Sequence, residues 1–181
     1  MDRVAELVRR EAAGENIEYV RFWGHRPRKD GRIGTACLSQ WWPAAFVVGG
    51  ERFATAEHFM MVGKARLFGD EEAAMKILET DEPAAAKKLG RTVRGFDDET
   101  WQAAAFDIVV RGNLAKFDQH DDLGKFLVGT GDAVLVEASP VDPVWGIGLA
   151  ADDPRATTPS TWRGTNLLGF ALMEVRDRLV S

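Results

Sequence analysis

The stretch TAEHFMMVGKARLF, from Thr55 to Phe68, decides the helical character of the fold. The hydroxyl of Thr55 can cap the free N–H groups of a first helical turn. Glu57, Met61 and Lys64 follow at i, i+4 and i+7, a spacing that puts them on one face of a helix. The stretch therefore predicts a helix with an acidic first turn and a basic last turn.

More helices are predicted on both sides of this stretch. Six further segments combine apolar residues at helical spacing with helix start or stop residues: 2–12, 70–78, 83–90, 97–117, 121–127 and 166–180. In the second of these, the Asp70 side chain is expected to cap the helix. In the third, Pro83 favours the helix start and Gly90 the helix end.

Strand signals are fewer and do not alternate with the helices. Segments 17–23 and 133–139 are rich in β-branched and other apolar residues, and 43–53 has the pattern of a hairpin turning at Gly49-Gly50. Segment 142–164 has no periodicity and is expected to be a long loop. The fold class predicted is α+β: one helix-dominated domain over residues 1–181 with a small, mostly antiparallel sheet.

The composition limits the class of protein. With 181 residues, 45% of them hydrophobic and 28% charged, the chain has the balance of a globular domain. Its formal net charge of -5 argues against a generally basic nucleic-acid binder. The single Cys37 excludes an internal disulfide and suits a reducing compartment. We find no membrane span and no signal peptide, and therefore expect a soluble cytoplasmic protein.

Common cofactor and metal motifs are absent from the sequence. His25, His58 and His120 are not at zinc-finger or H-E-x-x-H spacing, and neither a dinucleotide-binding nor a P-loop glycine motif occurs. Cys37 has no neighbouring histidine, so a small apolar role is favoured over a nucleophilic one.

Glu57 and Lys64 are the leading chemical candidates on the predicted helix. A helix dipole favours an ionised carboxylate in its first turn, and a carboxylate with an amine suits acid–base work at an anomeric carbon. The alternative is an ordinary surface helix with complementary end charges. At the end of the helix over 97–117, Asn113 and Lys116 are interpreted as a helix terminus with a favourable cation.

The loop 142–164 offers a second candidate region. Trp145-Gly146 and Trp162 combine indoles for stacking with glycine that lets the backbone approach a ligand. The alternative is a glycine-rich turn with tryptophan in the core. Both interpretations stay open on these residues alone.

Taken together, seven segments in order resemble the NADAR (YbiA-like) family over about residues 20–179. They are LSQWWPAAFVV (38–48), TAEHFMMVGKA (55–65), KKLGR (87–91), the tryptophan at 101, VVRGNLAKF (109–117), LVGTGDAVLVEASPVDPVWGIG (127–148) and the stretch from WRGTN to LMEVR (162–176). The resemblance implies hydrolysis of an N-glycosidic bond, with no metal or organic cofactor. It implies one of two substrates: small phosphorylated ribosyl intermediates of riboflavin synthesis, or ADP-ribose on guanine in nucleic acid.

The resemblance also implies roles for particular residues. Glu57 would be catalytic together with Lys64, which would form an imine with an opened ribose or bind phosphate. Substrate-binding roles would fall on Ser39, Gln40, Trp41, His58, Trp101, Trp145, Gly146, Trp162 and Asn166. Two positions depart from the usual family pattern: Gln40 stands where asparagine is common, and Ile147 follows Trp145-Gly146 where some members have an acid.

Other functions remain open at this stage. A module that binds ADP-ribose or another nucleotide without cleaving it would share the site but need no carboxylate. A structural or motility-associated protein would need an exposed apolar patch, of which the sequence gives no sign. The basic segment 21–32 would serve either a phosphate or a short single strand, or only solvation. The sequence indicates no oligomeric state.

Overall fold

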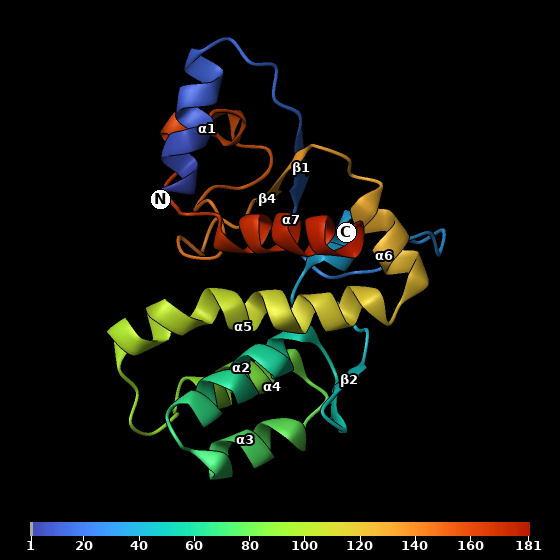
Figure 1. Cartoon of the computed structure of the whole chain (residues 1–181), viewed down its shortest axis with the longest axis vertical. Helices are drawn as coiled ribbons and strands as arrows, with labels where there is room; N and C mark the ends of the chain where they lie inside the picture. Colours follow the sequence, from blue (N-terminus) through green and yellow to red (C-terminus); the bar gives the residue numbers. More distant parts are fainter. Residues whose placement is uncertain (1) are drawn as a thin grey trace. The chain divides into compact units, whose positions relative to one another are not determined.

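The structure is a computed structural model, and it describes residues 2–181. Within this range the chain forms seven α-helices and two two-stranded sheets (Figure 1). The chain divides into two compact units. The continuous unit is Gln40–Gly124, and the split unit joins the segments up to Ser39 and from Lys125 onward. The helix-dominated α+β class predicted from the sequence is confirmed.

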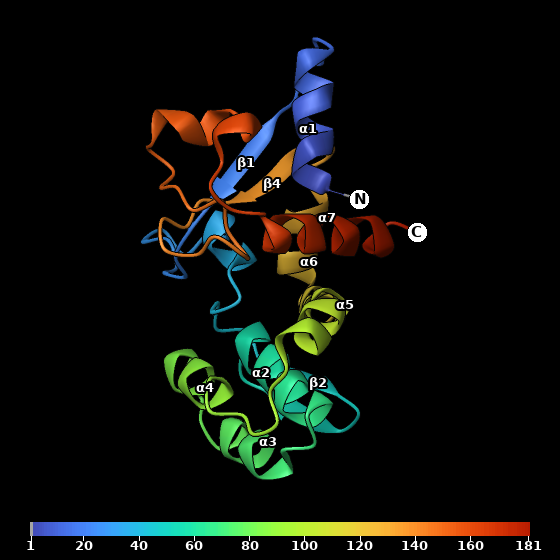
Figure 2. The same ribbon diagram turned by 90° about the vertical axis from the view of Figure 1, so that its left-hand side faces the viewer.

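The continuous unit is a helical cluster around α2 (Ala56–Leu67). This helix contacts α3 (Glu71–Leu78), α4 (Pro83–Gly90) and α5 (Asp98–Asp118), as Figure 2 shows. Eight of the twelve residues of α2 are buried, so the helix is covered on several sides. The alternative of an ordinary surface helix is therefore wrong for this stretch.

Two glycines allow α2 and α5 to approach closely. A Cβ atom on Gly63 would lie 2.7 Å from the Ile108 side chain, and one on Gly112 would lie 2.5 Å from the Phe59 ring. Residues 59 and 63 thus lie opposite 112 and 108, so the two helices run antiparallel. The start of α2 accordingly lies beside the later turns of α5.

The hairpin turn and the start of α3 in this unit agree with the prediction from the sequence. Strands β2 (Phe46–Val48) and β3 (Glu51–Phe53) pair antiparallel, and Gly49 and Gly50 have φ of 60° and 84°, as a tight hairpin turn needs. Asp70 caps α3 by accepting from the Ala73 N–H at 3.2 Å. These features are confirmed.

The capping role expected of Thr55 is wrong. Thr55 occupies the N-cap position of α2, but its hydroxyl makes no capping bond and lies 2.8 Å from His58 Nδ1 instead. One free N–H of the first turn is satisfied by the chain itself, because the Glu57 N–H donates to the Gln40 carbonyl at 3.0 Å. The imidazole one turn ahead competes for the hydroxyl, which sequence spacing does not reveal.

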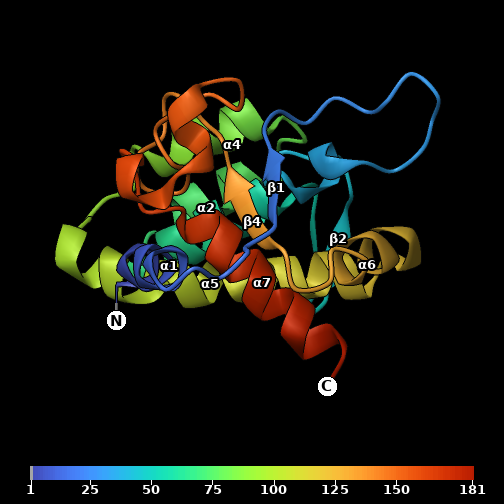
Figure 3. The same ribbon diagram turned by 90° about the horizontal axis from the view of Figure 1, so that it is seen from above.

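The split unit is built around two strands, β1 (Tyr19–Phe22) and β4 (Val134–Glu137). Helix α7 (Leu167–Leu179) packs against β4, as seen in Figure 3, and α1 (Arg3–Ala12) contacts the short η3 helix (Pro159–Thr161). The remaining elements are η1 (Thr35–Leu38), η2 (Pro154–Thr157) and the α6 helix (Asp121–Val128), which contains the boundary between the units.

The pairing of β1 with β4 corrects the expectation of a mostly antiparallel sheet. The two strands run parallel, with Tyr19 opposite Val134 and Phe22 opposite Glu137. A parallel pair needs a long connection, and the whole continuous unit lies between these strands in the sequence. The antiparallel expectation holds only for β2 and β3. Within residues 2–181, no helix is long and apolar enough to cross a membrane.

Candidate functional site

Most buried polar side chains of the continuous unit gather near the start of α2 and the later turns of α5. Apart from Asp70, they are Gln40, Thr55, Glu57, His58, Asn113 and Lys116, all at most 8% exposed. Polar groups are seldom buried so completely without a structural or chemical role. This group of buried side chains is the candidate functional site of the unit.

Gln40 links the start of α2 to α5. Its backbone carbonyl accepts from the Glu57 N–H, and its side-chain Oε1 accepts from Asn113 Nδ2 at 2.7 Å. The Nε2 group lies 3.9 Å from the Met60 sulfur. Both ends of the Gln40 amide thus contact protein, which favours a connecting role over the sugar contact expected from the sequence.

Asn113 presents an acceptor that no described residue uses. Its Nδ2 faces two carbonyl oxygens, those of Gln40 and of Val109 at 2.7 and 2.9 Å, so the amide orientation is determined. Its Oδ1 is buried and lacks a hydrogen-bond partner within residues 2–181. An unsatisfied buried acceptor is costly unless a donor from outside the chain completes it.

Lys116 is the functional candidate that the sequence reasoning missed. It was interpreted as a favourable cation at a helix end, but its side chain is fully buried at 0% exposed. It lies one turn after Asn113, and its Nζ is 4.8 Å from the centre of the Phe117 ring. Lys116 does lie in the last turn of α5, as interpreted from the sequence, but its side chain is not exposed there. The usable signal was the pair of polar residues one turn apart within VVRGNLAKF.

Glu57 is a buried carboxylic acid at the positive end of a helix. It is 5% exposed and lies in the first turn of α2, where the aligned N–H groups favour a negative charge. Such a group is suited to stabilising a developing positive charge or to activating a water molecule.

Lys64 lies two turns after Glu57 on α2 and has aromatic neighbours. Its Nζ is 4.2 Å from the centre of the Phe96 ring and 5.6 Å from that of Trp101, near the start of α5. Burial lowers the pKa of the Lys64 amine. Seven residues separate it from Glu57, or about 10 Å along the helix axis. The two side chains thus lie two turns apart on α2, and the printed neighbours of Lys64 are the rings of Phe96 and Trp101.

His58 points toward the connection between α3 and α4. It is 1% exposed, and burial lowers the pKa of its ring, with a smaller raising effect from the Thr80 backbone and Asp81. Nδ1 contacts the Thr55 hydroxyl, whereas Nε2 has no hydrogen-bond partner in the described chain. Burial thus disfavours the charged imidazole, and its polar neighbours differ from those of Lys64.

The two predicted tryptophans of this unit both lie near lysines. Trp101 faces the Lys64 amine, and Trp41 has the Lys87 amine 5.9 Å from its ring centre. Both indoles are half-buried. Each therefore keeps an accessible edge or face beside a lysine amine.

In the split unit, Asn166 is bonded entirely to backbone. Its Oδ1 accepts from the Glu137 N–H at 3.0 Å, and its Nδ2 donates to the Leu135 carbonyl at 2.9 Å. It is fully buried and has a positive φ of 53°. Both amide atoms expected to contact a sugar or base are thus used to hold the end of β4.

Gly146 and Gly164, in segment 142–164, leave room for neighbouring backbone rather than for a ligand. A Cβ on Gly146 would lie 2.8 Å from the Glu137 carbonyl, and one on Gly164 would lie 2.3 Å from the Gly146 carbonyl. The segments cross there, and the Asn166 N–H donates to the Gly146 carbonyl at 3.0 Å. Ile147, the second departure from the family pattern, is fully buried. These contacts favour the structural alternative for the glycines.

The remaining predicted residues of the split unit have mixed environments. Trp162 donates from Nε1 to the Ala156 carbonyl at 3.1 Å and meets the Tyr19 ring edge-on, so it packs locally. Trp145 is half-buried, and its backbone N–H donates to Asp142 Oδ1 at 2.8 Å. Ser39 is half-buried and ends η1. Among residues 2–181, no three histidine, cysteine or acidic side chains cluster so as to hold a metal ion.

A helix-rich α+β chain with this buried carboxylate, amide and lysine belongs to the NADAR domain family, whose model matches residues 21–180. That range includes residues of both units. Among similar proteins, N-glycosidase R617 of Acanthamoeba polyphaga mimivirus is 43% identical, with 90% of this chain and 97% of the relative covered. N-glycosidase YbiA of Escherichia coli (strain K12) is 30% identical, with 76% of each covered.

The solved structure of the Escherichia coli protein YbiA is also similar to this chain. The two superpose with a TM-score of 0.70 at 26% identity, over 90% of this chain and 85% of the other. The similarity supports the same helix-rich fold.

Proposed function

We propose that this protein is an N-glycosidase that hydrolyses the bond between a ribosyl group and an amino-heterocycle. The observation that carries the proposal is the buried Glu57 carboxylic acid at the start of α2. Burying a carboxylate is costly, and glycosidic cleavage needs one to stabilise an oxocarbenium-like transition state or activate water. The relatives R617 and YbiA are both named N-glycosidase, which supports the same bond type.

Lys64 is proposed as the second catalytic residue. Two roles were open for it: imine formation with an opened ribose, or phosphate binding. The lowered pKa of its amine supports the first, because a neutral amine is the nucleophile whereas phosphate binding needs the full charge. The neutral amine would add to C1 of the ring-opened ribosyl imine. As this bond forms, the imine nitrogen takes one proton from the lysine amine. The C1–N bond to the heterocycle then breaks, and the same nitrogen takes the second lysine proton and leaves as the free amine. Water hydrolyses the new imine and frees Lys64.

Trp101 and Trp41 are proposed to contact the heterocycle within the continuous unit. An indole offers a flat face for stacking, and Trp101 lies beside the amine that would attack C1. His58 would act as a neutral donor or acceptor. In the split unit, Trp145 keeps its proposed base contact. For Asn166, the occupied amide supports only a role in holding the chain.

Two substrate classes are proposed, and no metal or organic cofactor is needed for either. One is a small phosphorylated intermediate of riboflavin synthesis, and the other is ADP-ribose on guanine in nucleic acid. One feature supports the second: Trp23 is 62% exposed and is followed by the exposed residues Arg26 and Lys29. Exposed indoles next to basic residues are typical of surfaces that stack single-stranded bases.

The test is a paired hydrolysis assay on the purified protein without added metal. One reaction contains a ribosylaminopyrimidine phosphate and the other an ADP-ribosylated guanine oligonucleotide. Each is run with the wild type, with Glu57→Gln, and with Glu79→Gln as a control at an exposed glutamate of the same unit. Release of heterocycle or ADP-ribose that only Glu57→Gln abolishes supports the enzyme and selects its substrate. Nucleotide binding without release from either substrate would instead indicate a non-catalytic binding module.

Borohydride reduction during turnover tests the role of Lys64. A ribosyl adduct on the Lys64 peptide, absent in Lys64→Arg, is the expected result. An adduct on the Lys116 peptide would transfer the amine role to that residue, and turnover without any adduct would leave Lys64 with phosphate binding.

A further inference from the structure

Two aromatic rings lie near the Lys64 amine, and the ring of Phe96 is the closer of the two. The amine is 4.2 Å from the centre of the Phe96 ring, compared with 5.6 Å for Trp101. Phe96 in turn packs edge-on against Phe68, with ring centres 5.4 Å apart. Its side chain is 45% exposed, so the ring lies between the amine and the solvent-exposed surface of the unit.

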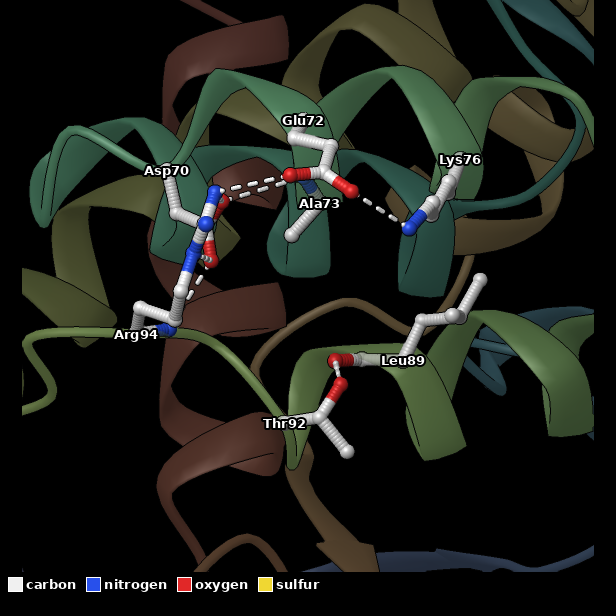
Figure 4. Close-up of polar contacts among 7 residues, drawn as sticks. All are labelled: Asp70, Glu72, Ala73, Lys76, Leu89, Thr92 and Arg94. Carbon is white, nitrogen blue, oxygen red and sulfur yellow. Dashed lines mark hydrogen bonds and ion pairs between the residues drawn. The ribbon is translucent and has the colours of Figure 1, made fainter.

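The segment that carries Phe96 is fastened to α3 through Arg94, which pairs with Asp70 and Glu72 (Figure 4). Asp70 accepts from the Arg94 backbone N–H at 2.9 Å and from its guanidinium at 2.7 and 3.2 Å. Its own N–H donates to the Ala65 carbonyl, the residue next to Lys64, at 2.8 Å. Asp70 therefore ties the end of α2, the start of α3 and the segment before Phe96 to one point.

A glycine completes this path between Arg94 and Phe96. Gly95 has a φ of 71°, a conformation that glycine adopts readily and other residues avoid. The chain thus turns sharply between the fastened Arg94 and the ring over Lys64. The position of the ring is set by backbone geometry and by the Asp70 contacts, and not only by its own packing.

We propose that Phe96 is a positioning residue for Lys64, and that the Asp70–Arg94 pair holds it there. The ring limits access of water to the amine and fixes the direction from which the amine can attack. The proposal rests on the proposed function for the use of the amine, but the arrangement itself is measurable without a substrate. The aromatic face attracts a cation, whereas the loss of water opposes the charge, and burial dominates at Lys64.

Several charged side chains on α2, on the fastened segment and at the start of α5 have other partners: Arg66 pairs with Glu51 and Glu71, Arg94 with Asp70 and Glu72, Asp97 with Thr100, and Asp98 with Gln102. Further charged groups of the same unit are Lys87 and Lys88 on α4, Arg91 after it, and Glu99 at the start of α5. Burial is the cause of the lowered pKa of the Lys64 amine, with no charged group among the causes. Changing its exposure to water should therefore change its titration.

The test is competitive acetylation of the amines with trace acetic anhydride over a pH series, read peptide by peptide by mass spectrometry. In the wild type, the Lys64 peptide should reach half-maximal labelling at lower pH than the exposed Lys76. In Phe96→Ala the Lys64 midpoint should rise, and labelling at pH 8 should fall about twofold or more, since the neutral fraction changes about tenfold per pKa unit. Arg94→Met should shift the midpoint in the same direction, and Phe96→Tyr should restore the wild-type profile.

The control is Met75→Ala, which removes another large exposed apolar side chain of the same unit and should leave the Lys64 profile unchanged. If Phe96→Ala does not fold, as judged by circular dichroism, Phe96→Leu and Arg94→Met carry the test. An unchanged Lys64 profile in folded variants would overturn the proposal. Hydrolysis of both substrates is measured in parallel. Shifted labelling without any wild-type hydrolysis would refute the proposed function alone, and hydrolysis with unshifted labelling would refute only the positioning role.

Discussion

Replacing Asn166 with alanine should destabilise the fold rather than impair ligand binding directly. The side chain makes two buried hydrogen bonds, to the Glu137 N–H and the Leu135 carbonyl, and their loss leaves both backbone groups unsatisfied. Each orphaned group costs about 1 kcal/mol or more. Alanine lacks the local side-chain hydrogen bonds that help asparagine to adopt a positive φ, so the φ of 53° adds about 1 kcal/mol.

The sum is about 3 kcal/mol, and for a chain of this length each kcal/mol lowers the melting temperature by about 2–4 °C. Asn166→Ala should therefore melt roughly 6–12 °C below the wild type in a circular dichroism melt. Asn166→Gly should be affected less, because glycine tolerates the positive φ. Thr165→Ala, which removes one exposed hydrogen bond to the Val144 carbonyl, serves as the neighbouring control. An Asn166→Ala protein that melts within about 2 °C of the wild type but no longer turns over substrate would refute the reasoning.

Three further predictions concern separate parts of the chain. The Arg94 guanidinium holds the pKa of Asp70 below its usual range, so Asp70 stabilises the fold above its unfolded-state pKa and loses this contribution as the pH falls toward the folded value. In Asp70→Asn, the free energy of unfolding measured with urea should depend less on pH between about pH 5 and 3 than in the wild type. An unchanged pH dependence would contradict this. Lys116→Met should reduce turnover, because it removes the buried amine one turn after Asn113 while keeping a side chain of similar length; retained turnover would exclude a catalytic role. Trp23→Ala should slow release from an oligonucleotide but not from the small substrate; equal loss on both would argue against stacking.

Features with a local cause were predictable from the sequence. Asp70 and Pro83 mark helix starts through their own side chains, and Gly49-Gly50 marks a hairpin because few other residues adopt its turn. These signals act over a few residues and need no knowledge of the rest of the chain. Even so, the Thr55 hydroxyl bonds to His58 in place of the helix end, since two local partners compete.

Features that depend on packing were not predictable. Lys116 is polar and near a helix end, which is usually an exposed position, and only the tertiary structure shows it to be fully buried. The spacing of Glu57 and Lys64 indicated one shared face, but spacing did not show that the helix is covered on several sides. The parallel pairing of β1 and β4 likewise depends on which distant strand is met, and a strand pattern carries no such information.

The order of the two units along the chain has a consequence for biosynthesis. A ribosome releases β1 early, yet its hydrogen-bonding partner β4 begins only at Val134, after the whole of Gln40–Gly124 has been made. The helical stretch relies on contacts close in sequence, which form fast, whereas the parallel pair must close a loop that contains the whole continuous unit. The nascent chain thus carries an unpaired strand, Tyr19–Phe22, through most of its synthesis. The brevity of that strand, with an arginine at its third position, limits its tendency to pair with a neighbouring nascent chain during this interval.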